Sequence, residues 1–371
     1  MKKEYFWPTL LALLALMLLA TILYYNSLDD DPIYVQGARS SPTTQPTCNE
    51  LSYNGEGKNI VFFSSKDQAL LYSNYLMQIK PFSENKENFN FYYIDDYIPA
   101  CTLYEGIALF CYSKDLIKKA SVCPSDYIVA VSSMDRSIRS SSYMNVMSLN
   151  TRHPLTVFPH EFGHSFANLA EEYTPAEIPG GSKNCQSQCE NFDIKDGCYE
   201  GCSKNNYYRS IDNGIMRTFL SDSYGVFNEK TISSKIKPPQ RTQTRLTGNV
   251  ITGYDALNSQ SCKDSQYYLV TAYYDEGVMV TQEIEQQAGC SNGLELEYYP
   301  DGQSATINPQ YVFNSGMTLD GKIEGMPLDY KGPVILKVPF EANQKILIKD
   351  SSGNILLNLK MADGSMPCRL S

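Results

Sequence analysis

Histidine, tryptophan and clusters of basic residues are all scarce in this chain. Its 371 residues include three histidines and one tryptophan, and no long run of Lys and Arg stands out. Lys and Arg total 31 against 41 Asp and Glu, a net charge of −10. A nucleic-acid-binding protein needs a basic surface to neutralise phosphates, so this balance argues against nucleic acid as a partner. Because histidine is so rare, two histidines close together are informative.

The rest of the composition is ordinary for a folded protein. Hydrophobic residues make up 42% of the chain and charged residues 19%, which excludes wholesale disorder. At roughly 100–200 residues per domain, a chain of 371 residues is expected to form two domains besides its tails.

The first thirty residues predict export from the cytoplasm. Lys2 and Lys3 precede an uncharged, largely apolar stretch, Tyr5–Leu28, and three aspartates follow it. About 20 apolar helical residues match the roughly 30 Å hydrocarbon core of a bilayer, and the positive-inside rule places the N-terminus in the cytoplasm. We therefore expect residues 1–28 to form a cytoplasmic stub and a single-pass signal anchor in the cell membrane. A cleaved signal peptide, and hence a secreted chain, is the alternative.

Eleven cysteines agree with an extracytoplasmic location, because disulfides persist there and are rare in the cytosol. Their odd number leaves at least one thiol free or bonded to another chain. Four of them follow a C-x3-C-x8-C-x3-C spacing, for which we expect two facing short helices joined by two disulfides. A structural zinc held by four thiolates is the alternative. The expected pairs are Cys185–Cys202, Cys189–Cys198 and, further on, Cys262–Cys290.

Composition divides the exported part into three regions. Residues 29–57, rich in Asp, Ser, Thr, Pro and Gly, are expected to form a stalk. Residues 58–235 alternate strand-like and helix-like patterns, which predicts an α+β domain with a mixed sheet. Residues 236–371 contain strand-like runs separated by turn signals and no helical pattern, which predicts an all-β, sandwich-like domain.

His160 and His164 belong to a single HExxH motif with Glu161 between them. Residues four apart lie on one face of a helix, so both imidazoles can reach one Zn²⁺. Glu161 can take a proton from a water activated by the metal. A chance HExxH in a chain this poor in histidine is on the order of one in a thousand. The alternative is an ordinary helix with two structural histidines; His153, isolated before a proline, is interpreted as a non-ligand.

The helix that carries the motif has predictable features. It is expected to begin near Thr156, acting as an N-cap, because Pro159 is tolerated only in the first turn. Gly163 either lets a neighbouring strand or substrate come close to the metal, or allows tight packing of the helix.

A catalytic zinc also needs a third protein ligand and an open coordination position. The metzincin spacing would place that ligand at Ala170, which cannot bind metal. Glu171 is the predicted ligand, with Glu172 as the second candidate and Glu177 as the third. A continuous helix would put Glu171 about 10 Å along the axis from His164, so we expect the helix to end or bend before Glu171.

The motif and its surroundings resemble the signature of the IgA-peptidase family of zinc metallopeptidases. The likeness rests on the HEFGHSF run at 160–166, the LAEEY run at 169–173, Tyr208-Arg209 and the NGIMR run at 213–217. It extends over about residues 58–235.

The resemblance implies a zincin-like fold, hydrolysis of peptide bonds and a Met-turn at Met216 beneath the metal. Glu171 replaces the aspartate usual in that family, which keeps a carboxylate and adds one methylene. Pro159 stands where the family prefers an aliphatic residue.

These expectations combine into one hypothesis. The fold would be an α+β zincin-like catalytic domain, with a mixed sheet and an active-site helix, followed by an all-β sandwich-like domain and preceded by a transmembrane helix. The protein would be a membrane-anchored, extracytoplasmic zinc metallopeptidase with protein or peptide substrates, in which His160, His164 and Glu171 bind one Zn²⁺ and Glu161 is the general base. The alternatives are a surface-tethered binding or adhesion protein with a structural or vestigial zinc site, and a zinc hydrolase of non-peptide amides.

Overall fold

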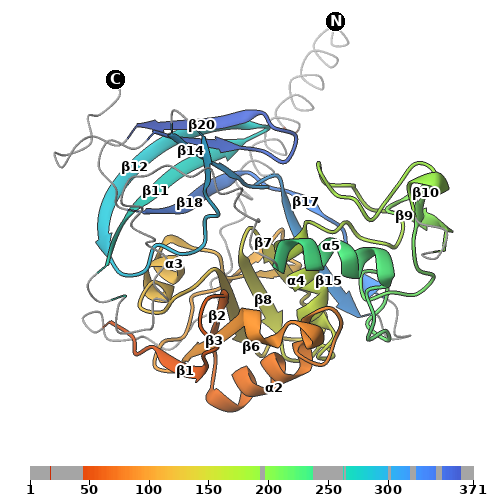
Figure 1. Cartoon of the computed structure of the whole chain (residues 1–371), viewed down its shortest axis with the longest axis horizontal. Coiled ribbons are helices and arrows are strands. Elements are labelled where there is room, and N and C mark those ends of the chain that lie inside the picture. Colours follow the sequence, from red (N-terminus) through yellow and green to blue (C-terminus); the bar gives the residue numbers. More distant parts are fainter. Residues whose placement is uncertain are drawn as a thin grey trace, which may run out of the picture.

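The computed structural model describes most of the chain after residue 44. The described residues are 45–192, 197–236, 265–299, 302–317, 323–339 and 345–360, with Met17 and Cys262. Within them, four α-helices and strands in several sheets form a mixed α/β structure (Figure 1).

A nine-stranded mixed sheet lies at the centre of the described structure. Its order is β1-β3-β2-β6-β8-β7-β15-β16, and β17 also pairs with β15. β3, β2, β6 and β8 are parallel, whereas β7 is antiparallel to both β8 and β15. The strands are β1 (Asn49–Ser52), β2 (Lys58–Phe63), β3 (Phe89–Ile94), β6 (Tyr127–Ser132), β7 (Ser140–Tyr143), β8 (Val146–Asn150), β15 (Tyr311–Met317), β16 (Ile323–Glu324) and β17 (Leu328–Asp329).

The helices connect or flank these strands. Two of them begin at serine N-caps: the hydroxyl of Ser65 accepts from the N–H of Gln68, and that of Ser113 accepts from the N–H of Leu116. Three short 3-10 helices occur in the connections, η1 (Phe82–Glu84), η2 (Lys86–Asn88) and η3 (Cys189–Asn191). The α-helices are α2 (Lys66–Leu76), α3 (Lys114–Ala120), α4 (Val157–Ala167) and α5 (Val226–Ile236).

Smaller sheets account for the remaining strands. A three-stranded antiparallel sheet has the order β12-β11-β18, and a four-stranded sheet has the order β13-β14-β19-β20. Two further sheets are the two-stranded pairs β4–β5 and β9–β10. Their bounds are β4 (Thr102–Tyr104), β5 (Ala108–Phe110), β9 (Tyr199–Cys202), β10 (Lys204–Arg209), β11 (Gln266–Asp275), β12 (Val278–Ala288), β13 (Glu297–Tyr299), β14 (Gly302–Thr306), β18 (Gly332–Pro339), β19 (Lys345–Lys349) and β20 (Ile355–Lys360).

Both faces of the central sheet are buried, because successive side chains of a strand point to opposite faces. On β2, Ile60 and Phe62 join the apolar core formed with α2, α4 and α5. Val61 and Phe63 join the second core, which is formed with α3 and with strands of the C-terminal region such as β11 and β18. The C-terminal strands therefore cover one face of the sheet and three helices cover the other.

The predicted fold class, an α+β zincin-like domain followed by an all-β sandwich, is wrong. The described residues form a mixed α/β arrangement in which β15, from the region expected to be all-β, pairs with β7 in the central sheet. Figure 1 shows β15 beside α4. A local pattern shows that a segment is extended but does not show its partner, which depends on tertiary context. Phe313 pairs with Ser142, which lies far away in the sequence.

The expectations for the N-terminal region have separate outcomes. Among the described residues, no helix is long and apolar enough to cross a membrane. The segment expected to be an anchor, residues 1–28, lies outside the described residues apart from Met17. Within the segment expected to be a stalk, β1 pairs with β3 and so forms part of the central sheet.

Ten cysteines form five disulfides, which are typical of proteins that fold outside the cytoplasm. The three expected pairs, Cys185–Cys202, Cys189–Cys198 and Cys262–Cys290, are confirmed. The expected two facing helices are wrong, because Cys189 begins a single 3-10 turn and Cys202 ends strand β9. The two remaining disulfides are Cys48–Cys123 and Cys101–Cys111.

Candidate metal centre

Helix α4 places the two histidines of the HExxH motif inside the protein. It begins directly after Thr156, as expected, but the Thr156 hydroxyl donates to the carbonyl of Phe219 (2.7 Å) and does not cap the helix. Pro159 lies in the first turn, where its missing N–H needs no partner. His160 is fully buried and His164 is 4% exposed.

The helix ends three residues after His164. This early end lets the chain turn back, so that Glu171, the predicted third ligand, lies beside the two histidines. Asn168 takes the left-handed conformation (φ 51°), which asparagine tolerates better than most residues. The N–H of Leu169 then bonds to the carbonyl of Gly163 (3.2 Å). The expectation that the helix ends before Glu171 is confirmed.

His160, His164 and Glu171 form a group that could hold a metal ion. One ligand atom from each lies within 4.8 Å of the others. The Nε2 atoms of the two histidines are 3.3 Å apart, and the Glu171 carboxylate lies 3.3 Å from that of His160 and 3.1 Å from that of His164. Glu171 is fully buried.

Hydrogen bonds fix which nitrogen of each imidazole faces the group. His160 Nδ1 lies 2.9 Å from the carbonyl of Ile215, and His164 Nδ1 lies 2.6 Å from the carbonyl of Leu169. A carbonyl only accepts, so each Nδ1 carries the proton and each Nε2 offers a lone pair. Metal-binding histidines are commonly oriented by a hydrogen bond of this kind.

These donors fit a cation. Two imidazole lone pairs and a carboxylate converge in a buried space, where facing acceptors repel one another unless a positive charge lies between them. Burial lowers the pKa of His160, but the charge of Glu171 outweighs burial and raises that pKa to about 9. Burial raises the pKa of Glu171, but His164 and His160 outweigh it and lower that pKa to about 2.

Glu161 lies beside the ligand group and does not belong to it. It is fully buried, and its Oε1 accepts a hydrogen bond from the hydroxyl of Ser315. Its Oε2 has no hydrogen-bond donor among the described residues. Burial raises the pKa of Glu161, and the two histidines offset part of that rise. A buried carboxylate with one free oxygen and a raised pKa is suited to accept a proton.

The other candidate residues lie elsewhere. Glu172 points away from the histidines and accepts from the side-chain amides of Asn228 (2.8 Å) and Asn184 (3.2 Å). Burial raises its pKa to about 7, against the effect of these hydrogen bonds. Glu177 is exposed and pairs with Lys204 (3.2 Å). His153 bonds to Ser140 and to the carbonyl of Arg136 (3.1 and 3.2 Å).

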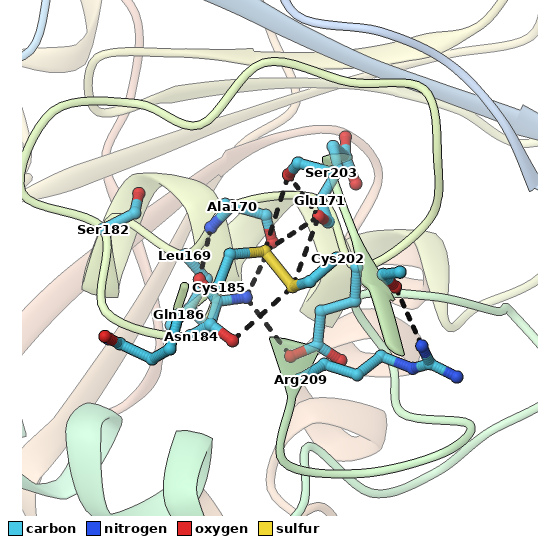
Figure 2. Close-up of a disulfide and its surroundings, with 12 residues drawn as sticks. Leu169, Ala170, Glu171, Ser182, Asn184, Cys185, Gln186, Cys202, Ser203 and Arg209 are labelled. Carbon is cyan, nitrogen blue, oxygen red and sulfur yellow. Dashed lines mark hydrogen bonds between the residues drawn. A yellow bond between two sulfur atoms is a disulfide. The ribbon is translucent and has the colours of Figure 1, made fainter. Parts of the chain in front are cut away.

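A disulfide-linked loop holds the backbone on either side of Glu171 (Figure 2). Asn184 accepts from the N–H of Ala170 (2.7 Å) and donates to the carbonyl of the same residue (2.8 Å). The hydroxyl of Ser203 donates to the carbonyl of Glu171 (2.6 Å), and the sulfur of Cys185 lies 3.4 Å from it. The loop closed by the Cys185–Cys202 disulfide therefore holds the backbone of Glu171, the predicted third ligand.

The segment around Met216 contacts both helix α4 and the backbone next to Glu171. The carbonyl of Ile215 orients His160, and the carbonyl of Met216 accepts from the N–H of Glu172 (2.9 Å). Met216 is fully buried against helix α4: a Cβ added to Gly163 would lie 2.7 Å from its sulfur. Gly163 therefore serves close packing against Met216, the second of the two expectations for this glycine.

Strand β15 supplies contacts that sequence reasoning missed. The ring of Phe313 stacks on the imidazole of His164 (centroids 4.1 Å apart, planes at 11°), and Ser315 bonds to Glu161. No motif marks these two residues, because β15 reaches the site through its pairing with β7.

No family model matches the chain, and no curated protein sequence is significantly similar to it.

Proposed function

We propose that the protein is an extracytoplasmic zinc metallopeptidase. The observation that carries the proposal is the convergence of His160 Nε2, His164 Nε2 and the Glu171 carboxylate, with Glu161 beside them. The motif likeness to the IgA-peptidase family supports peptide bonds as the substrate class. The five disulfides support action outside the cytoplasm.

The donor set favours zinc. Imidazole nitrogens combined with one carboxylate are typical of zinc sites, whereas magnesium and calcium take mainly oxygen ligands. Three protein ligands leave a fourth position open, as in catalytic zinc sites. A structural zinc site has four protein ligands, and no fourth His, Cys, Asp or Glu joins the group among the described residues.

In this reaction the residues of the site would have separate roles. Zinc, when bound, supplies a Lewis acid that polarises the scissile carbonyl and lowers the pKa of water. Glu161 accepts the proton of the attacking water on its free Oε2 and then passes it to the leaving amine. Ser315 holds the other oxygen of Glu161, and the Ile215 and Leu169 carbonyls hold the two imidazoles in position.

The test pairs metal content with turnover in Glu161→Gln, which keeps the shape of the side chain and removes its basicity. We expect one zinc per chain in both proteins, and cleavage of unfolded casein slower by about 10²–10⁴-fold in the variant. Ser165→Ala, on the same helix and outside the ligand group, is the control and should cleave like the wild type. Measurable cleavage at equal rates by Glu161→Gln and wild type would refute the mechanism.

One observation favours the second function, a binding protein with a non-catalytic metal site. His160, Glu161 and Glu171 are all fully buried, so substrate has no direct path to them in this conformation. Zinc bound at one per chain, with no hydrolysis of casein or of small amides under any condition, would favour that function. Cleavage of small amides alone would favour the non-peptide hydrolase.

A further inference from the structure

Strand β15 covers the metal group. It is the C-terminal element that pairs with β7 and lies against α4 (Figure 1). We propose that β15 is an autoinhibitory strand, which keeps the site closed and must separate from β7 before a polypeptide can reach Glu161. This inference rests on the proposed peptidase function and adds its regulation.

Two side chains of β15 contact the candidate metal ligand His164 and the candidate general base Glu161 directly. Phe313 stacks face to face on His164, and Ser315 donates to the carboxylate of Glu161. Because these residues are two apart in a strand, both point to the same face, toward α4. A strand laid over a general base and a metal-binding imidazole takes the space that a peptide would need.

The opposite face of β15 carries the contacts that hold it down. The buried amide of Asn314 donates to the carbonyl of Met326 and accepts from Arg139 (3.2 Å), which immediately precedes β7. Gly325 lies so close that an added Cβ would overlap the Asn314 carbonyl and lie 2.7 Å from the Tyr173 hydroxyl. The backbone at Gly325 and Met326 therefore packs directly against Asn314.

Burial shows that this arrangement excludes substrate. His160, Glu161 and Glu171 are 0% exposed and His164 is 4% exposed. Hydrolysis requires a carbonyl and a water within about 3 Å of the reacting groups. A general base without exposed surface cannot meet a polypeptide, so the described conformation is latent.

The pairing that holds β15 on β7 is short. Phe313, Asn314 and Ser315 pair with three residues of β7, whereas β2 and β3 pair over six residues in the middle of the sheet. A strand joined to its neighbour by few pairs separates from it at lower free energy than a strand paired along its whole length. Since β15 also pairs with β16 and β17, we expect these three strands to leave β7 together while the sheet that carries α4 stays folded.

The first test measures access to zinc, without relying on turnover. Asn314→Ala removes both side-chain hydrogen bonds from the covering strand and leaves its metal-facing side chains intact. Asn145→Ala is the matched control, because it removes an amide hydrogen bond (2.8 Å, to the Asp126 carbonyl) at the distal end of the β7–β8 hairpin. In zinc-loaded full-length protein, we expect EDTA to remove zinc at least tenfold faster from Asn314→Ala than from wild type and Asn145→Ala. Equal rates in all three would overturn the proposal.

Casein cleavage by the same proteins separates this proposal from the proposed function. Faster zinc removal and faster cleavage in Asn314→Ala would support both. Faster zinc removal from Asn314→Ala with no cleavage by any of the proteins would support the covering role of β15 and refute the proposed peptidase function. Cleavage by wild type as fast as by Asn314→Ala would overturn autoinhibition.

Hydrogen exchange on the wild-type protein keeps the proposal testable if Asn314→Ala does not fold. The N–H groups of β15 should exchange at least tenfold faster than those of β8, through a local opening. Exchange of both strands at one rate, through global unfolding, would overturn the proposal.

Discussion

Replacing Gly163 by alanine would test how the packing beneath helix α4 maintains the metal site. A Cβ at this position would lie 2.7 Å from the sulfur of Met216 and 3.2 Å from a ring carbon of Tyr224. Alanine gains about 1 kcal/mol over glycine in a helix, whereas overpacking a core costs about 1–3 kcal/mol. The two effects predict a net loss of roughly 0–2 kcal/mol in the free energy of unfolding.

The loss of zinc affinity should be larger than the change in stability suggests. Met216 can relieve the overlap only by moving, and its neighbour Ile215 carries the carbonyl that orients His160. Disturbing the hydrogen bond behind a metal ligand typically costs 10–100-fold in affinity. We therefore expect zinc affinity, measured by competition with a chelator, to fall by about that factor in Gly163→Ala.

Two further variants show whether the effect passes through Met216. Ser165→Ala changes the same helix without approaching Met216 and should leave zinc affinity unchanged. In a Met216→Ala background, where the sulfur is absent, Gly163→Ala should cost little further affinity, giving a large coupling in the double-mutant cycle. Additive losses, or full zinc affinity in Gly163→Ala alone, would refute the reasoning.

Three other changes probe the scaffold. Burial lowers the pKa of Lys337 from 10.5 to about 7. Between these two pH values the unfolded chain binds a proton that the native state lacks, so the free energy of unfolding should rise by up to about 1.4 kcal/mol per pH unit from about pH 7 to pH 10.5. Urea titrations at several pH values should show this rise in wild type and not in Lys337→Met. Replacing Cys185 and Cys202 by serine should lower stability by about 2–4 kcal/mol and weaken zinc binding, whereas replacing Cys101 and Cys111 should weaken stability alone. Asn184→Ala should cost about 1–3 kcal/mol in thermal or urea unfolding, because it leaves the backbone polar groups of Ala170 buried without partners.

The elements nearest the histidines could be predicted from the sequence, because local chemistry determines them. The HExxH spacing required a helix, Pro159 limited its start, and the distance along the axis required it to end before Glu171. The structure brings Glu171, and neither Glu172 nor Glu177, to the two histidines. The repeated spacing of four cysteines likewise predicted two disulfides correctly.

The cover over the site could not be predicted, because it depends on a long-range pairing. The YVFNSGM run of β15 has a strand-like beginning, but Asn, Ser and Gly then interrupt its apolar pattern. Its buried polar residues are explained by contacts with distant partners: Ser315 bonds to Glu161, and Asn314 bonds to Arg139 and Met326. The same pairing joins the regions that composition separates and makes the predicted fold class wrong.

The most direct test of the central claim is the metal content of the purified chain. Wild type, His164→Ala and His153→Ala would be compared by mass spectrometry of metals after zinc loading and dialysis, with circular dichroism to verify folding. His153 lies outside the ligand group and serves as the histidine control. We predict one zinc per chain in wild type and His153→Ala, and none in folded His164→Ala. A folded wild type that binds no zinc, or a His164→Ala variant that binds as much as wild type, would contradict the account.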